Sequence, residues 1–143
     1  MQWINVGNFL IYLGISFPLL GLGLYVFMRT TPYKEFDLIA KGTDLSDMHK
    51  SLAAQAAALD LGGKLLGLAL VMASAIYHSV NLVDLAIWGV IGMVFQVIVF
   101  YIFEWITPFK VIDEIPKGNV GVGIFSAFIS LATGLLLAAL ISY

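Results

Sequence analysis

Four long apolar segments constrain what this chain can fold into. They cover residues 4–28, 52–77, 85–103 and 120–142, and the first and last of them contain no charged residue. A helix needs about 20 mainly apolar residues to cross the hydrocarbon core of a bilayer. Open strands cannot cross, because their backbone groups would remain unpaired in lipid. The sequence therefore predicts an all-α integral membrane protein with four transmembrane helices.

The composition agrees with a bilayer as the main partner of the chain. Of its 143 residues 61% are hydrophobic and 11% are charged, whereas soluble domains have roughly 25% charged residues. The net charge of −2 gives no basis for binding nucleic acid. The chain has no cysteine and only 2 histidines, which argues against a disulfide framework or a metal site. We expect no cofactor, no bound metal and no nucleic-acid partner.

The basic residues predict how the chain is oriented. They gather in two of the three connections: Arg29, Lys34, Lys41 and Lys50 in the first, and Lys110 and Lys117 in the third. The turn over residues 78–84 contains neither lysine nor arginine. Short loops rich in lysine and arginine stay on the cytoplasmic side. We therefore expect a multi-pass protein of a bacterial inner (plasma) membrane, with both termini and the 78–84 turn in the periplasm.

The two basic connections resemble each other in sequence. "TPYKEFDLIAKG" (31–42) aligns without a gap with "TPFKVIDEIPKG" (107–118), and seven of the twelve positions are identical. This indicates two tandem two-helix repeats, over residues 1–80 and 81–143, that cross in the same direction. Such units are related by a pseudo-twofold axis along the membrane normal. Residues 43–51 are extra in the first unit.

Each repeated string also predicts a short amphipathic helix at the cytoplasmic surface, which we call an elbow helix. The first Thr and Pro suit the N-cap and first helical position, and the final Lys-Gly is a helix-stop signal. The residues in these roles are Thr31, Pro32 and Gly42, and Thr107, Pro108 and Gly118. Apolar residues three apart (Tyr33, Phe36 and Ile39; Phe109, Ile112 and Ile115) favour contact with the inner leaflet. The elbows are then either capped connections or docking sites for lipid or a cytoplasmic protein partner.

These elbows, together with three apolar strings, resemble the YjfL-type inner-membrane proteins. The strings are "LLGLALVMASAI" (65–76), "IWGVIGMVFQVIVF" (87–100) and "GNVGVGIFSAFISLATGLLLAALISY" (118–143). The two-helix module of that family is a domain of unknown function, DUF350. The resemblance implies the four-span plan and a link to envelope stress, and it brings no established biochemical activity. It also implies small or hydroxyl residues at positions 60 and 64, so the charged pair found there is expected to be a subfamily property.

That pair, Asp60 and Lys64, interrupts the second apolar segment. Residues four apart share a helix face, and each charge near mid-membrane costs roughly 2.5–3.5 kcal/mol to insert. We therefore expect both side chains to face the interior of the bundle or an interface between copies. Gln96 lies at a similar depth and is a candidate hydrogen-bond partner of the pair or of a facing backbone. His78 and Glu104, near the membrane boundaries, are candidate ends of an ion path.

Small residues predict close helix packing beside the pair. Gly63 and Gly67 form a GxxxG step in the second segment. In the fourth segment small residues recur every four positions, at Ser126, Ser130, Gly134 and Ala138. Such surfaces let neighbouring helix backbones approach closely.

Three roles for the pair stay open at this point. It could be an ion pair that fixes helix packing, a proton or cation pathway, or a binding site for an anionic or zwitterionic small molecule. Nothing in the sequence resembles a catalytic triad, a metal-ligand spacing or a phosphate-binding loop, so we do not expect an enzyme. The favoured hypothesis is a homo-oligomeric membrane assembly linked to envelope stress, in which Asp60 and Lys64 fix the packing. The alternative is an oligomeric proton or cation channel, or a small-solute transporter, that uses the same two residues.

Overall fold

The computed structural model describes residues 2–141, and every regular element in this range is a helix. The helices are α1 (Gln2–Thr30), α2 (Glu35–Lys41), α3 (Met48–His78), α4 (Leu82–Ile106), α5 (Val111–Glu114) and α6 (Val120–Ile141). Four of them, α1, α3, α4 and α6, are long and apolar enough to cross a membrane. The predicted all-α fold with four candidate spans is confirmed. Ser142, the last residue of the predicted fourth span, lies outside the described residues, as do Met1 and Tyr143.

Capping residues, and not the limits of the apolar runs, set where α3 and α4 begin. The Asp47 carboxylate accepts a hydrogen bond from the backbone N–H of Lys50 at 3.2 Å, so α3 starts four residues before its predicted span. Asn81 likewise accepts from the N–H of Asp84 at 2.9 Å and starts α4. Both residues are good N-caps because their side chains satisfy free N–H groups of the first turn. The 31 residues of α3 give it a length of about 45 Å, more than the roughly 30 Å of a hydrocarbon core.

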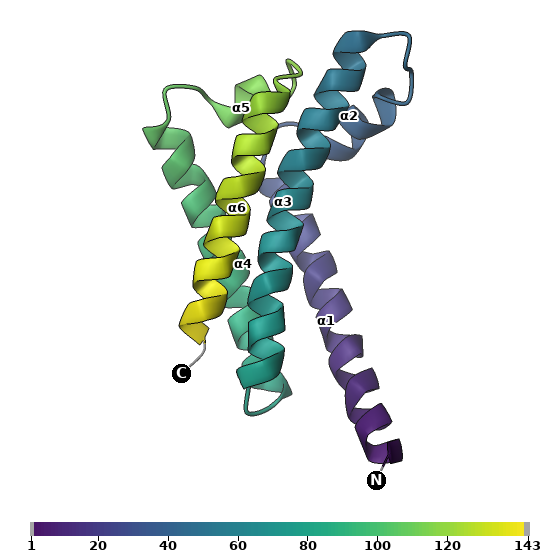
Figure 1. The fold of residues 1–143 in the computed structure, drawn as a ribbon, viewed down its shortest axis with the longest axis vertical. Helices are drawn as coiled ribbons and strands as arrows, with labels where there is room; N and C mark the ends of the chain where they lie inside the picture. The colour runs from purple at the N-terminus through teal and green to yellow at the C-terminus, as the bar shows by residue number, and fades with distance from the viewer. Residues whose placement is uncertain (1, 142–143) are drawn as a thin grey trace.

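Helix α3 is the central element of the bundle. It packs against α1, α2, α4 and α6, and it runs parallel to α6 along most of their length (Figure 1). Helix α1 diverges from the other spans toward its N-terminal end (Figure 1). Its buried residues, Gly23 and Phe27, lie in its C-terminal half. The α1–α3 and α4–α6 connections lie at one end of the bundle, and the α3–α4 turn lies at the other (Figure 1).

The interface between α3 and α6 is made backbone to backbone. A Cβ atom added to Gly63 would overlap the backbone of Ala127, and one added to Gly67 would overlap the carbonyl of Ser130. A Cβ on Gly134 would overlap the backbone of Gly67 in turn. Further toward the C-terminal ends of these helices, the Ser74 hydroxyl donates a 2.6 Å hydrogen bond to the carbonyl of Ala138. Glycine at these positions is what allows the two helices to approach so closely.

The predicted caps of the elbow helices are wrong at their N-terminal ends. Helix α2 begins at Glu35 with Lys34 at its N-cap, and α5 begins at Val111 with Lys110 at its N-cap. The threonines instead close the preceding spans: Thr31 Oγ1 donates to the Phe27 carbonyl at 3.2 Å, and Thr107 Oγ1 donates to the Phe103 carbonyl at 2.7 Å. Pro32 and Pro108 therefore lie in the turns before the helices and not in their first turns.

The two connections differ at their C-terminal ends. Helix α2 ends at Lys41 with Gly42 as its C-cap. Helix α5 has only 4 residues, and the chain continues through turns to Gly118, whose φ of 83° lies in the left-handed region that glycine adopts readily.

The apolar stripe of the elbows faces the bundle and not the membrane surface, contrary to the prediction. Tyr33 and Ile115 are buried in a cluster with Ala56 and Phe100. Ile39, Phe109 and Ile112 pack against the same cluster, and of the six stripe residues only Phe36 is largely exposed, at 51%. In the first connection the stripe is buried in protein because α2 docks on the N-terminal half of α3.

Candidate functional site

A fully buried carboxylate, that of Asp60, lies at the centre of the candidate site. It is 0% exposed and accepts hydrogen bonds from three different parts of the chain. The ammonium of Lys64, one turn further along α3, donates to Oδ2 at 2.7 Å, and the hydroxyl of Tyr33, before α2, donates to the same atom at 2.7 Å. The hydroxyl of Ser126 on α6 donates to Oδ1. We call Tyr33, Asp60, Lys64 and Ser126 the Asp60 cluster.

The second charge of the pair, Lys64, is also buried inside the bundle. It is 3% exposed, and its ammonium nitrogen lies 4.0 Å from the centre of the Phe100 ring on α4. A cation over an aromatic face is attracted by the negative face of the ring, and more strongly when it is out of water. Asp60 and Phe100 therefore surround the Lys64 ammonium from two helices, as the cost of placing a charge in the membrane requires.

Gln96 contacts the backbone of α3 and not the charged side chains. With its amide oriented to satisfy both of its polar atoms, the nitrogen donates to the carbonyl of Lys64 at 3.1 Å and the oxygen accepts from the N–H of Leu68 at 3.0 Å. The side chain thereby joins α4 to α3 one turn beyond the pair. Of the two partners considered from the sequence, the facing backbone is the one observed.

The two candidate path ends have separate local roles. His78 contacts the carbonyl of Ser74 on its own helix at 2.9 Å, and lies fourteen residues, or about 21 Å, from Lys64 along α3. Glu104 Oε2 accepts from the N–H of Val111 at 2.8 Å, so Glu104 provides the side-chain cap of α5 that was expected from Thr107. No hydrogen bond described in residues 2–141 joins either residue to Asp60 or Lys64.

Sequence reasoning missed a second buried acid beside the cluster, Glu35. Its residue is 0% exposed, although it is the first residue of a short helix in a polar connection. The repeat alignment contains the signal that could have found it. Glu35 aligns with Val111, which is 3% exposed and part of the core. An acid at a position that is a core valine in the other string indicates a buried carboxyl group.

Tyr33 lies among these acids as a neutral donor. Burial raises its pKa above the ordinary value, and the negative charge of Asp60 raises it further. The phenol therefore keeps its proton and donates a hydrogen bond to Asp60. Tyr33 was assigned from the sequence to a membrane-facing stripe, because a tyrosine three positions from other apolar residues gives no sign of an inward hydroxyl partner.

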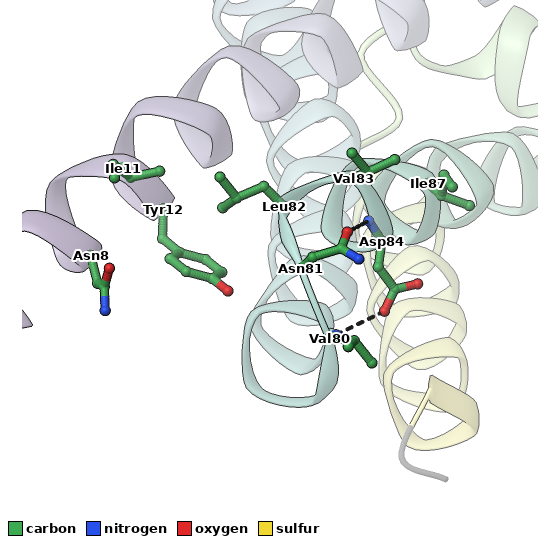
Figure 2. Close-up of a pocket in the computed structure, with 9 residues that line it drawn as sticks. All are labelled: Asn8, Ile11, Tyr12, Val80, Asn81, Leu82, Val83, Asp84 and Ile87. Carbon is green, nitrogen blue, oxygen red and sulfur yellow. Dashed lines mark hydrogen bonds between the residues drawn. The ribbon is translucent and has the colours of Figure 1, made fainter.

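A groove at the other end of the bundle is separate from the Asp60 cluster. It has a volume of about 970 Å³ and lies between the N-terminal half of α1 and the start of α4 (Figure 2). Its polar lining consists of Asn8, Tyr12, Asn81 and Asp84. Figure 2 shows that Asn81 and Asp84 are engaged in the turn that starts α4. Neither Asp60 nor Lys64 lines this groove.

Comparison with known proteins identifies the family of this helical chain. The family profile described as Domain of Unknown Function (DUF350) matches residues 1–141. The chain belongs to the DUF350 family. It is 36% identical over 129 residues to the UPF0719 transmembrane protein YshE of Bacillus subtilis (strain 168). This match covers 90% of this chain and 88% of the relative. It is 27% identical over 132 residues to the UPF0719 inner membrane protein YjfL of Escherichia coli (strain K12), covering 92% and 91%.

The DUF350 assignment confirms the resemblance inferred from the elbows and apolar strings. No solved structure matches the chain. The names of both relatives describe a membrane location and no enzymatic activity. With its four apolar helices, this DUF350 protein is a transmembrane protein of a family whose function is unknown.

Proposed function

We propose that this protein is a non-enzymatic, multi-pass inner-membrane module in which the Asp60–Lys64 pair fixes the packing of the helices. The observation that carries this proposal is that both oxygens of Asp60 accept hydrogen bonds, from donors on three segments of the chain. A carboxylate on an ion path must exchange its partners with water or with the moving ion. Asp60 is instead fully buried and joins the α1–α2 connection, α3 and α6.

The energetics of buried charges favour this packing role. An unpaired charge in a bundle interior is strongly destabilising, and removing one partner of a buried pair typically costs about 3–5 kcal/mol. The bonded arrangement is therefore available only when α6 and the first connection are correctly placed against α3. The pair makes one arrangement of the helices much more favourable than others.

The proposal includes the tandem repeat, which the α3–α6 interface supports. A Cβ on Gly123 would lie 2.7 Å from the carbonyl oxygen of Ala56, and one on Gly134 would overlap the backbone of Gly67. In both pairs the residue on α6 lies 67 positions after its partner on α3, whereas the elbow strings align at an offset of 76. The difference equals the nine extra residues 43–51. Equivalent residues of the two units thus meet at the interface, as they do beside a twofold axis that runs along it.

We also propose that the module is a homo-oligomer with α1 at the contact between copies. Gly7, Gly14 and Gly21 recur every seven residues on α1, and a Cβ added to any of them would have no atom within 4 Å. Small residues on an open face let a second membrane helix approach closely. In this proposal both termini are periplasmic, the basic connections are cytoplasmic, and the assembly acts in envelope stress.

Flux and assembly measurements test the packing role against the channel alternative. Purified protein is reconstituted in liposomes with a pH-sensitive dye under an imposed potential, as the wild type, Asp60→Asn and Lys64→Met. Asp84→Asn, a change of the same chemistry in the separate groove, is the matched control. We expect no flux from any of the proteins. We expect loss of assembled protein on native gels for Asp60→Asn and Lys64→Met and not for Asp84→Asn. Flux that Asp60→Asn abolishes while assembly is unchanged would overturn the proposal in favour of conduction.

Cross-linking tests the contact between copies. Because the chain has no cysteine, a single Gly14→Cys variant reports only on contacts of that position. We expect disulfide-linked dimers in membranes for Gly14→Cys and none for Ile15→Cys, since Ile15 packs against the core within one copy. Equal cross-linking of both positions would show that α1 meets other copies only by collision.

A further inference from the structure

A second carboxyl group, that of Glu35, is buried next to the Asp60 cluster without a cation of its own. Its Oε1 contacts the hydroxyl of Thr31, and among the described residues its Oε2 has no hydrogen-bond partner. Glu35 is 0% exposed. An ionised carboxylate in such a place costs far more than a neutral one, so buried acids without a partner take up a proton.

The hydrogen count around Thr31 also indicates a proton on Glu35. The Thr31 hydroxyl has one hydrogen and two close oxygens, the Phe27 carbonyl at 3.2 Å and Glu35 Oε1. The carbonyl can only accept, so the hydroxyl donates to it when both contacts are hydrogen bonds. The second contact then needs a hydrogen on the Glu35 carboxyl group. A neutral Glu35 satisfies both contacts, and an ionised Glu35 can satisfy only one.

The charges around Glu35 disfavour a further negative charge. Asp60 and Glu104 both act on Tyr33, which lies two residues before Glu35, and the buried cation Lys64 is bonded to Asp60. Besides Tyr33, the ionisable residues that line one pocket with Glu35 are Tyr25, Arg29, Lys34 and Asp37. All four are exposed to solvent, and Arg29 donates a hydrogen bond to the Tyr25 hydroxyl. Like charges disfavour ionisation.

We propose that Glu35 is a proton-binding site that controls whether the α1–α2 connection stays docked on the bundle. With the proton bound, the carboxyl donates to Thr31 and the connection lies against α3, where Tyr33 reaches Asp60. When the proton leaves for the solvent, a buried anion remains beside two other acids, and the connection moves out to hydrate it. Tyr33, two residues earlier, leaves Asp60 with it. This inference rests on the packing role proposed above for the Asp60 cluster.

The structure provides a short route for that proton. Glu35 lines a pocket of about 530 Å³ together with Thr31, Arg29 and Asp37. Arg29 and Asp37 are exposed, so the pocket is in contact with the solvent at the loop end of the bundle. The proton therefore exchanges with the solvent outside the membrane-spanning part of the chain. Because the docked form holds the proton, rising pH favours the open form.

Thiol labelling across pH measures this opening. Ile39 on α2 is half-buried against the core cluster, so in nanodiscs an Ile39→Cys thiol reacts with a maleimide faster when α2 lifts. Leu45→Cys, which replaces a residue that is 83% exposed, corrects for the thiolate fraction that increases with pH. We expect the corrected labelling rate of Ile39→Cys to rise several-fold from mildly acidic to alkaline pH. Adding Glu35→Gln should abolish that rise, and adding Asp37→Asn, on the same helix, should leave it.

Two further measurements separate this inference from the packing role. Infrared spectra of the wild type at neutral pH should contain the carbonyl band of a protonated carboxyl group, which Glu35→Gln removes. Tyr33→Phe should raise the labelling rate at every pH and preserve the rise with pH. An absent carboxyl band, or a rise that persists in Glu35→Gln, would overturn the proton site and leave the packing role intact. Should Glu35→Gln fail to fold, a flat wild-type profile overturns the proposal and a rising profile kept by Asp37→Asn supports it.

Discussion

The hydroxyl of Tyr33 donates a 2.7 Å hydrogen bond to Oδ2 of Asp60, which lies 27 positions further along the chain. The bond joins a connection between helices to the middle of a candidate span. Hydrogen bonds to charged groups contribute about 1.5–3 kcal/mol. The α1–α2 connection is therefore a structural part of the bundle and not only a link between two spans.

Replacing Tyr33 with phenylalanine should lower the free energy of unfolding by about 1.5–3 kcal/mol. The change removes the donor and keeps the ring that packs in the core cluster. Unfolding in mixed micelles of mild detergent and dodecyl sulfate measures it. Tyr25→Phe is the control, because the Tyr25 hydroxyl bonds to Arg29 at the exposed end of α1 and should matter little. Equal losses for the two variants would contradict the role of the Asp60 bond.

Tyr33 should also fail to ionise while the protein is folded. Its pKa is raised by burial and then by the charge of Asp60. A raised folded-state pKa gives stability that is present below the ordinary value of 10.0 and is lost as the pH rises above it. Tyrosinate absorbance of the folded protein should have the same alkaline amplitude in the wild type and in Tyr33→Phe. A decrease equal to one tyrosine in the variant would show that Tyr33 titrates freely.

Breaking the buried pair from either side should be costly. Asp60→Asn leaves the Lys64 ammonium without its anion, and Lys64→Met leaves Asp60 without its cation, each with an expected loss of about 3–5 kcal/mol. The double variant should lose less than the sum of the two, because it leaves no buried charge unpaired. A double-mutant cycle of unfolding free energies measures this coupling. Lys117→Met is the control: it breaks the exposed pair with Glu114 and should change stability little. An additive double variant would refute the coupling.

The adjacent glycines of α3 offer a matched test of the α3–α6 interface. A Cβ at Gly63 would overlap the backbone of Ala127, whereas a Cβ at Gly62 would have nothing within 4 Å. Gly63→Ala should destabilise the protein by about 1–3 kcal/mol, because helix α6 has to shift. Gly62→Ala should instead stabilise it by about 0.5–1 kcal/mol through helix propensity. The same unfolding assay compares them, and similar effects of both changes would mean that α6 does not pack against this face.

The all-α fold and its four candidate membrane-spanning helices could be predicted because the bilayer imposes a simple rule. Four runs of about 20 apolar residues allow little else, and the cost of an isolated charge directs Asp60 and Lys64 inward. The ends of the helices followed a different rule. Thr31 and Thr107 have the chemistry of N-caps, but the same hydroxyls can also close a preceding helix, and sequence alone does not decide between these two partners.

The partners of Asp60 could not be predicted for a related reason. Only the pair itself has local spacing, four residues on one helix. Tyr33 and Ser126 reach Asp60 because of how α2 and α6 dock, and that contact depends on the glycines of two helices at once. Glu35 was missed because an acid in a polar connection is normally solvated. Its burial follows from the docking of α2, which pattern and composition do not contain.

The order in which the chain is made gives the bond between Ser126 and Asp60 a further consequence. Ser126 is synthesised 66 residues after Asp60, so α1, α3 and α4 are made before it. Until then Oδ1 of Asp60 lacks its donor and the glycine face of α3 has no α6 to cover it. The nascent protein thus passes through a stage in which its central helix, α3, lacks its main packing partner. Completion of the bundle depends on the last helix, so truncation before α6 removes the main partner of α3.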